Sequence, residues 1–430
     1  MKRYALDSLI QWKNSKTRKP LILKGARQVG KTWLMKHFGE NYFKNTAYID
    51  FYNNVRMKEL FSNDFDITRL IEGLQAEAQC KINPNDTLIV FDEVQEVPLA
   101  LTSLKYFYEN SPDYHIIAGG SLLGISDRKG SSFPVGKVDF HELYPLNFCE
   151  FLEAIGESEL ASTLISCDWK LITVFKSKLI DYLRKYYYVG GMPECVVAYN
   201  EDRSYDVVRK IQNNILTAYI NDFSKHIPAA LLTKVRGLWD NIPRQLSREN
   251  KRFSPGLINK GSRMKDYEDA LQWLADAGLI YKIKQISRPS IPLKSYTNEA
   301  FKIYLLDVGL LSCMVELDAK ILLQAHAVFE EFKGSLTENF VCQELISTGK
   351  ALYYWSSERT AEVDFVFKHD SDVYPLEVKA EENLQSKSLK VYSEKFNPSL
   401  ALRASMRDYR EDGWLTNIPL YGIGVWNKCN

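Results

Sequence analysis

The stretch Gly25-Ala26-Arg27-Gln28-Val29-Gly30-Lys31-Thr32 decides the fold of the amino-terminal part of this chain. It matches the phosphate-loop pattern GxxxxGK[ST], follows the apolar run 21–24 and precedes a helix-like stretch that starts at Trp33. In such a loop the glycines let successive backbone N–H groups face a phosphate, and the helix N-terminus adds partial positive charge. Lys31 would reach the β- and γ-phosphates, and the Thr32 hydroxyl would ligate Mg²⁺. We therefore predict that the whole loop binds ATP with Mg²⁺, through Gly25, Ala26, Arg27, Gln28, Val29, Gly30, Lys31 and Thr32.

A second apolar run, 88–91, ends in the adjacent acids Asp92 and Glu93. Beside a phosphate loop, such a pair supplies a metal ligand and a residue that polarises the attacking water. We predict that Asp92 joins Thr32 in holding Mg²⁺, and that Glu93 is catalytic together with Lys31. Acids at strand ends also cap helices, and that alternative stays open.

Ser121 ends the run 114–120 and resembles the polar sensor position of AAA-type ATPases. In that fold the sensor strand lies between the phosphate-loop strand and the strand of Asp92, so its end faces the γ-phosphate. The resemblance implies a catalytic role for Ser121, with an ordinary turn serine as the alternative. Arg128 and Lys137 follow this strand, but neither is assigned as an arginine finger.

Short apolar runs alternate with helical patterns through the first third of the chain. This alternation predicts a parallel sheet flanked by helices. The expected strands are 20–24, 46–51, 87–91 and 114–118, and the clearest expected helices are 67–81 and 99–109.

The middle of the chain, from about Asp168 to Leu322, reads as mostly helical. A helix over 265–277 and two strand-like runs, 279–286 and 301–306, suggest a winged helix. Such a helix could contact DNA phosphates, or the region could be a lid on the nucleotide domain, and both readings stay open. The basic side chains that crowd this stretch are Arg244, Arg248, Lys251, Arg252, Lys260, Arg263 and Lys265.

Near the carboxy terminus, Asp364, Glu377 and Lys379 form the spacing D-x12-E-x-K. A symmetric hairpin centred between Asp370 and Ser371 would place Asp364 opposite Glu377, with Cβ atoms roughly 5 Å apart. Lys379 would project on the same face as Glu377. A divalent ion would relieve the repulsion between the two carboxylates, and Lys379 could orient or activate a water.

This arrangement resembles the PD-(D/E)XK nuclease core, whose order of helix, three strands, helix and strand also fits residues 335–402. The resemblance implies a Mg²⁺ or Mn²⁺ site formed by Glu338, Asp364 and Glu377, with Lys379 catalytic. Gln385 lies near the place of a further polar residue of that core. A structural salt-bridge cluster, or a core that has lost activity, is the alternative.

Composition limits the remaining possibilities. The 430 residues carry a net charge of +1, so strong overall attraction to nucleic acid or anionic membranes is not indicated. Seven cysteines without a CxxC pair predict free thiols in a reducing compartment. No apolar run approaches the roughly 18 residues of a membrane span, and no signal-peptide core follows Met1, so we expect a cytoplasmic protein with no membrane partner.

The motifs in their order resemble prokaryotic AAA-type ATPases that join a phosphate-loop domain to a winged-helix-like region and a restriction-endonuclease-like domain. We therefore expect an α/β multidomain fold: a P-loop NTPase parallel sheet (1–160), a helical winged-helix middle domain (161–325) and a small α/β nuclease-like domain (326–430). The expected function is ATP hydrolysis coupled to DNA binding and metal-dependent DNA cleavage. The alternative is a nucleotide-dependent switch whose inactive carboxy-terminal domain docks a protein partner. The oligomeric state is left open.

Overall fold

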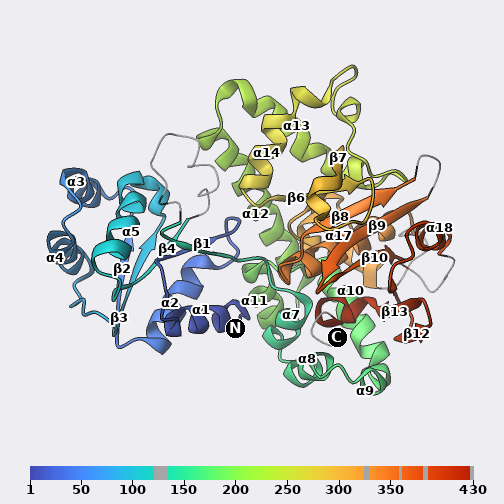
Figure 1. Ribbon diagram of the computed structural model, residues 1–430, viewed down its shortest axis with the longest axis horizontal. Helices are drawn as coiled ribbons and strands as arrows, with labels where there is room; N and C mark the ends of the chain where they lie inside the picture. Colours follow the sequence, from blue (N-terminus) through green and yellow to red (C-terminus); the bar gives the residue numbers. More distant parts are fainter. Residues whose placement is uncertain (121–133, 135, 324–329, 358–360, 381–385, 427–430) are drawn as a thin grey trace. The chain divides into compact units, whose positions relative to one another are not determined.

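The computed structural model describes residues 1–120, 134, 136–323, 330–357, 361–380 and 386–426 (Figure 1). The chain packs as two compact units. The amino-terminal unit comprises Lys2–Tyr144 with Asp276–Gly278, and the carboxy-terminal unit comprises Met1, Pro145–Ala275 and Leu279–Asn430. The finer division at 160/161 and 325/326 stays a prediction.

The amino-terminal unit is built on a five-stranded parallel sheet with the order β2-β3-β4-β1-β5. Strand β4 lies between the phosphate-loop strand β1 and the Asp92 strand β3, which confirms the predicted position of the sensor strand. The alternation of strands and helices is also confirmed, although β5 was missed because it is short and mostly polar. The strands are β1 (Leu21–Lys24), β2 (Asn45–Asp50), β3 (Thr87–Asp92), β4 (His115–Gly119) and β5 (Asp139–Glu142).

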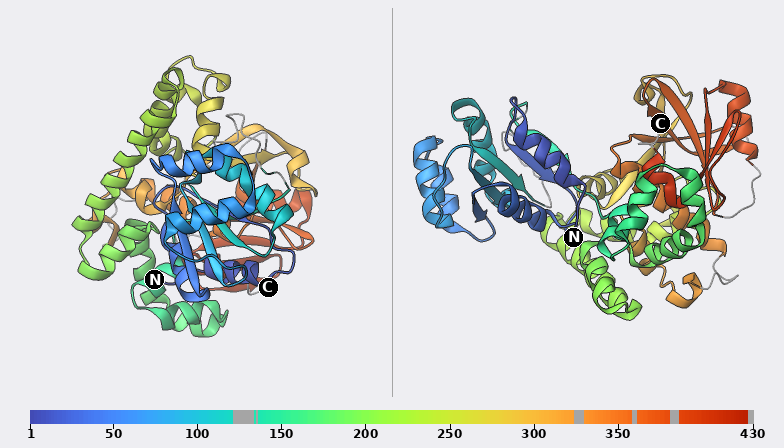
Figure 2. Two further views of the ribbon diagram at one scale, coloured as in Figure 1. Left: turned by 90° about the vertical axis from the view of Figure 1, so that its left-hand side faces the viewer. Right: turned by 90° about the horizontal axis from the view of Figure 1, so that it is seen from below.

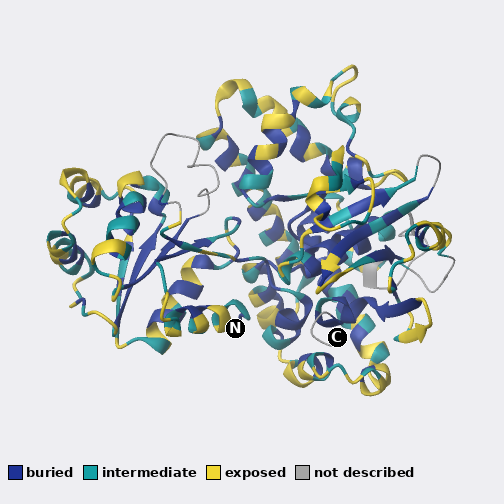
Figure 3. Ribbon diagram, viewed as in Figure 1, coloured by how far each residue is buried: buried dark blue, intermediate teal, exposed yellow. Residues whose placement is uncertain are grey.

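Helices cover this sheet, and the strands between them are largely buried (Figures 2 and 3). One core joins the sheet to α3, α4 and α5 through side chains such as Phe61, Leu74 and Leu104. Elsewhere, α1 meets α2 where Trp12 packs against Phe38. The helices are α1 (Ala5–Asn14), α2 (Lys31–Tyr42), α3 (Val55–Asn63), α4 (Ile67–Ala78) and α5 (Pro98–Asn110), with the 3₁₀ turn η1 (Val94–Glu96) after β3.

Helices dominate the first half of the carboxy-terminal unit, as predicted. The predicted helix 265–277 is a 3₁₀ turn, η3 (Met264–Asp266), followed by α14. The helices of this half are α7 (Phe148–Ala154), α8 (Ser158–Ile165), α9 (Trp169–Val174), α10 (Lys176–Val189), α11 (Pro193–Asp202), α12 (Tyr205–His226), α13 (Ala229–Leu246), α14 (Glu268–Asp276), α15 (Val308–Met314) and α16 (Ala319–Leu323).

An eight-stranded mixed sheet forms the second half, with the order β12-β13-β11-β10-β9-β8-β6-β7. The hairpin of β6 (Ile280–Ile286) and β7 (Thr297–Leu305) is present as predicted, but β6 also pairs in parallel with β8. The hairpin is therefore part of the same sheet as the carboxy-terminal strands. A winged helix stays a prediction for this region.

The predicted order of helix, three strands, helix and strand is confirmed by α17 (Glu330–Ser347), β8 (Leu352–Ser356), β9 (Glu362–His369), β10 (Asp372–Val378), α18 (Lys387–Phe396) and β11 (Ala401–Ser405). The hairpin register is also confirmed, because Asp372 pairs with His369 and Leu376 with Phe365. The apolar stretch 420–425 suggests a further strand from its sequence, but that prediction is wrong, since the stretch forms a 3₁₀ turn and α19 (Ile423–Trp426). A short buried apolar run has no periodicity that separates strand from helix. The remaining strands, β12 (Arg410–Asp412) and β13 (Leu415–Pro419), were not predicted.

The structure bears on the state of the cysteines and on the character of the helices. Free thiols are confirmed at Cys80, Cys149, Cys195, Cys313 and Cys342. The prediction was wrong for Cys167, which is disulfide-bonded. Among the described residues, no helix combines the length and the apolar character that crossing a lipid bilayer requires.

Candidate active site

The phosphate loop connects β1 to α2 and depends on two of its glycines. Gly25 has φ of 144°, and a Cβ there would lie 2.3 Å from the Leu143 carbonyl oxygen. Gly30 has φ of 94° and is the N-cap of α2. Since side chains are strained at such φ values, the loop can curl over the helix N-terminus only with glycine at these positions. The cradle expected for a phosphate is therefore built as the pattern predicts.

Lys31 lies inside this loop and is 7% exposed. Its Nζ donates to the carbonyl oxygens of Gly25, at 2.9 Å, and Ala26, at 2.7 Å. Burial lowers the pKa of Lys31 to about 8, against the opposing effect of the Glu93 and Asp92 carboxylates. An ammonium group held at this point is placed to meet phosphate oxygens.

Asp92 accepts hydrogen bonds at both carboxylate oxygens. Thr32 Oγ1 donates to Oδ2 at 2.7 Å, Tyr48 Oη donates to the same oxygen at 2.8 Å, and the Glu93 N–H donates to Oδ1 at 3.0 Å. The hydroxyl and carboxylate predicted to share Mg²⁺ are thus in direct contact, although they lie 60 residues apart in sequence. Oxygen donors of this kind are what Mg²⁺ prefers, so the residues fit the metal.

Glu93 follows the end of β3 in a left-handed conformation, with φ of 50°. Its carboxylate accepts a hydrogen bond from Gln95 Nε2 at 2.5 Å. Its negative charge partly offsets the lowering of the Lys31 pKa by burial. A non-glycine residue in this conformation is uncommon and costs free energy, which is typical of functional sites. The structure therefore brings Lys31, Thr32, Asp92 and Glu93 to one end of the sheet.

Two further residues support this site, and the sequence did not point to them. Tyr48, on β2, shares Asp92 Oδ2 with Thr32. Arg3 is 3% exposed, and its guanidinium donates to the carbonyl oxygens of Val29, at 2.9 Å, and Tyr144, at 2.6 Å. Only the pairing of β2 with β3 could have revealed Tyr48, and no motif marks Arg3.

Ser121, the proposed sensor, lies outside the described residues, and so does Arg128. Lys137 is described, and its Nζ pairs with Glu109 Oε1 at 2.9 Å.

Because the pKa of Lys31 is lowered to about 8, we expect nucleotide affinity to depend on pH. Below pH 8 the ammonium is charged and attracts phosphate, whereas above pH 8 binding must first take up a proton. Affinity should fall by up to about tenfold per pH unit above 8. Titration with a fluorescent ATP analogue between pH 7.5 and 9.5 would measure this, because phosphate groups with a pKa of about 6 are fully ionised there. Lys31→Arg, which stays charged, should show a flat profile, and a flat profile in the unmodified chain would contradict the prediction.

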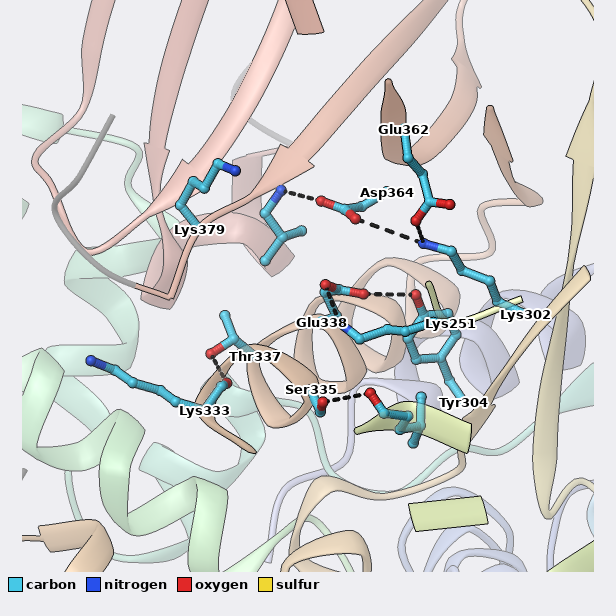
Figure 4. A network of polar contacts seen from close by, with 12 residues as sticks. Lys251, Lys302, Tyr304, Lys333, Ser335, Thr337, Glu338, Glu362, Asp364 and Lys379 are labelled. Atoms are coloured by element: carbon cyan, nitrogen blue, oxygen red, sulfur yellow. Dashed lines mark hydrogen bonds and ion pairs between the residues drawn. The ribbon is translucent and has the colours of Figure 1, made fainter. Parts of the chain in front are cut away.

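The carboxy-terminal acids Glu338, Glu362 and Asp364 lie near two lysines, the fully buried Lys302 and the largely buried Lys251 (Figure 4). Lys251 pairs with Glu338 Oε1, and Tyr304 Oη donates to Glu338 Oε2 at 3.1 Å. Lys302 lies 2.5 Å from Glu362 Oε1 and 3.8 Å from Asp364 Oδ1. Burial and the Glu338 charge raise the pKa of Asp364 to about 7.

The predicted metal ligands have separate partners. Asp364 Oδ2 accepts from the Val378 N–H at 2.8 Å, and Glu377 Oε1 pairs with Lys379 Nζ at 2.8 Å. No group of three or more His, Cys, Asp or Glu side chains in the described part of the chain is arranged to hold a metal ion. The structure therefore does not assemble Glu338, Asp364 and Glu377 as one set of ligands. Gln385 lies outside the described residues.

Three family models match successive stretches of the chain. Residues 17–152 match a family described as an AAA domain. Residues 180–321 and 333–421 match two families described as domains of unknown function, DUF8612 and DUF4143. An uncharacterised protein of Methanocaldococcus jannaschii, MJ1544, is 23% identical over 381 residues, which span 86% of this chain and 77% of the relative.

Two solved structures show a distant likeness. The Walker-type ATPase paby2304 of Pyrococcus abyssi has a TM-score of 0.43 and 15% identity, over 73% of this chain and 95% of that one. The Orc1 protein of Aeropyrum pernix, solved in complex with DNA, has a TM-score of 0.26 and 11% identity, over 73% of this chain and 90% of that one. At such TM-scores neither likeness carries an argument about function.

Proposed function

We propose that this chain hydrolyses ATP and couples its nucleotide state to the engagement of DNA by the carboxy-terminal unit. The match of residues 17–152 to a family described as an AAA domain supports the first part. The observation that carries the first part is the contact of Thr32 Oγ1 with Asp92 Oδ2, at 2.7 Å, beside the buried Lys31. A chance glycine-rich turn would not bring these distant residues together.

Each residue of the site has a defined task in this proposal. The loop N–H groups and Lys31 bind the phosphates and stabilise the negative charge that develops on them. Thr32 and Asp92 hold Mg²⁺, which when bound neutralises charge on the phosphate oxygens. Glu93, half-buried next to Asp92, orients and polarises the attacking water.

The DNA part of the proposal rests on the basic stretch that runs from the end of α13 to η3, just before α14. Six of its side chains are exposed and could contact phosphates, namely Arg244, Arg248, Arg252, Lys260, Arg263 and Lys265. The seventh, Lys251, is not among them, because its side chain is 11% exposed and pairs with Glu338. The support for DNA contact is thus a local surface charge, in a chain with little net charge.

ATP turnover measured with and without single- and double-stranded DNA tests the coupling. We expect DNA to raise turnover severalfold in the unmodified chain and in Lys379→Ala, because Lys379 is not part of the ATP site. Any Mn²⁺-dependent DNA cleavage seen in the same reactions should disappear in Lys379→Ala. Equal turnover with and without DNA would contradict the coupling but leave the ATPase assignment intact.

DNA cleavage by the carboxy-terminal core is a more specific activity than DNA binding, and one observation favours it. Glu377 is 4% exposed, its Oε1 pairs with Lys379, and its Oε2 has no hydrogen-bond partner among the described residues. A buried carboxylate oxygen without a partner is costly unless a ligand satisfies it. The second candidate, a nucleotide-dependent switch with an inactive carboxy-terminal core, is favoured by the lysines that pair with Glu338, Glu362 and Asp364.

A further inference from the structure

Five charged side chains of the carboxy-terminal unit form what we call the lysine–carboxylate cluster: Lys251, Lys302, Glu338, Glu362 and Asp364 (Figure 4). Three carboxylates gathered in a largely buried place repel one another and need positive charge nearby. Such a set of acids could recruit a divalent ion, but here two ammonium groups lie among them.

Lys302 has the position that a bound cation would take between two carboxylates. It is 0% exposed, and its Nζ lies 2.5 Å from Glu362 Oε1 and 3.8 Å from Asp364 Oδ1. These distances define ion pairs with both acids, and the one to Glu362 is a direct contact. The ammonium group therefore supplies the positive charge that the two acids need, as a bound metal ion would.

Lys251 supplies the second charge, at Glu338. Its side chain is 11% exposed and that of Glu338 is 10% exposed, so little solvent screens the pair. Tyr304 donates to the other oxygen of Glu338, which leaves neither carboxylate oxygen without a partner.

The lysines and the acids come from different segments. Glu338 lies on α17, and Glu362 and Asp364 lie on β9, all within the predicted nuclease-like core. Lys302 lies on β7, the edge strand of the sheet, and Lys251 lies in the connection after α13. The positive charge is therefore supplied by the region that precedes the core.

We propose that Lys251 and Lys302 are resident cations that occupy this cluster in place of a divalent metal ion. A metal binds there only when these side chains are withdrawn or replaced. The inference rests on the nuclease-like reading of the core and adds its regulation: the β6–β7 hairpin and the connection after α13 keep the site closed to metal.

The test compares the unmodified full chain with Lys251→Met/Lys302→Met, both free of nucleotide. Methionine keeps much of the volume and removes the charge. Mn²⁺ binding is measured by calorimetry, and Tm is measured with Mn²⁺ and with a chelator. We expect the double variant to gain saturable Mn²⁺ binding and a rise in Tm of about 5 °C at saturating Mn²⁺, because an ion that binds only the folded state stabilises it. The unmodified chain should show neither.

Two controls isolate the cluster. Lys178→Met removes a lysine from the more exposed pair with Glu157 and should gain no Mn²⁺ response. Adding Glu362→Gln and Asp364→Asn to the double variant removes the carboxylates and should abolish the gained response.

Two results would overturn the inference. One is a folded double variant without Mn²⁺ binding, and the other is Mn²⁺ binding by the unmodified chain that is lost in Asp364→Asn. If the double variant does not fold, Lys302→Met alone replaces it, since Lys302 is the cation that lies between two carboxylates, and the same gain is expected at Glu362 and Asp364. ATP turnover by the unmodified chain reports on the proposed function independently of all these measurements.

Discussion

Lys31→Ala should lower kcat/KM for ATP by at least about 100-fold, because it removes the ammonium group that we propose contacts the phosphates inside the loop. The side chain is buried, and its Nζ contacts the carbonyl oxygens of Gly25 and Ala26. The conformation of the loop depends on its glycines and not on the Lys31 side chain, so the alanine variant should keep the fold. Steady-state release of phosphate measures the loss, and circular dichroism checks the fold.

Lys58→Ala is the matched control for this variant. Lys58 is an exposed lysine on α3 of the same unit, outside the phosphate loop. Its replacement should leave turnover within about twofold of the unmodified chain, since exposed substitutions away from a site have small effects. Normal ATP turnover in Lys31→Ala would contradict the assignment of the nucleotide site.

Glu93→Gln should separate nucleotide binding from hydrolysis. Glutamine keeps the shape of the side chain but cannot polarise a water as a carboxylate does. We expect kcat to fall by about 10²- to 10⁴-fold, the range of general acid–base catalysis, while the Kd for ATP changes little. A fluorescent nucleotide titration together with single-turnover hydrolysis gives both quantities.

Glu96→Gln makes the same chemical change three residues along the chain. Glu96 lies at the end of the turn η1, at a similar level of burial to Glu93 but past the end of β3. It should retain normal turnover. Equal losses in the two variants would assign the effect to the stability of the turn rather than to the attacking water.

The way Lys31, Thr32, Asp92 and Glu93 come together could be predicted from the sequence, because local rules govern it. The phosphate loop binds through backbone N–H groups, whose direction depends on Gly25, Gly30 and the following helix. An apolar strand that ends in Asp92 and Glu93 reaches the same edge of a parallel sheet as the loop does. Tyr48 and Arg3 were missed, since their contacts depend on strand pairing and on packing across long sequence separations.

The carboxy-terminal core was predicted less completely. The symmetric hairpin fixed the register of β9 with β10, and that register is the one observed. The partners of the acids were not predictable in the same way. Lys302 and Glu362 are far apart in sequence. They meet only because β6, the hairpin partner of β7, also pairs with β8, so that β7 and β9 belong to the same sheet.

The sequence by itself therefore determined the nucleotide loop, its acidic partners and the order of elements in the carboxy-terminal core, since each follows from spacing along the chain. Only the tertiary structure decided which charges meet at that core. A carboxylate in a largely buried place pairs with whatever cation the fold brings to it, and here the fold brings Lys251 and Lys302. The spacing of residues along the chain does not predict such contacts, because they depend on which strands pair across the sheet.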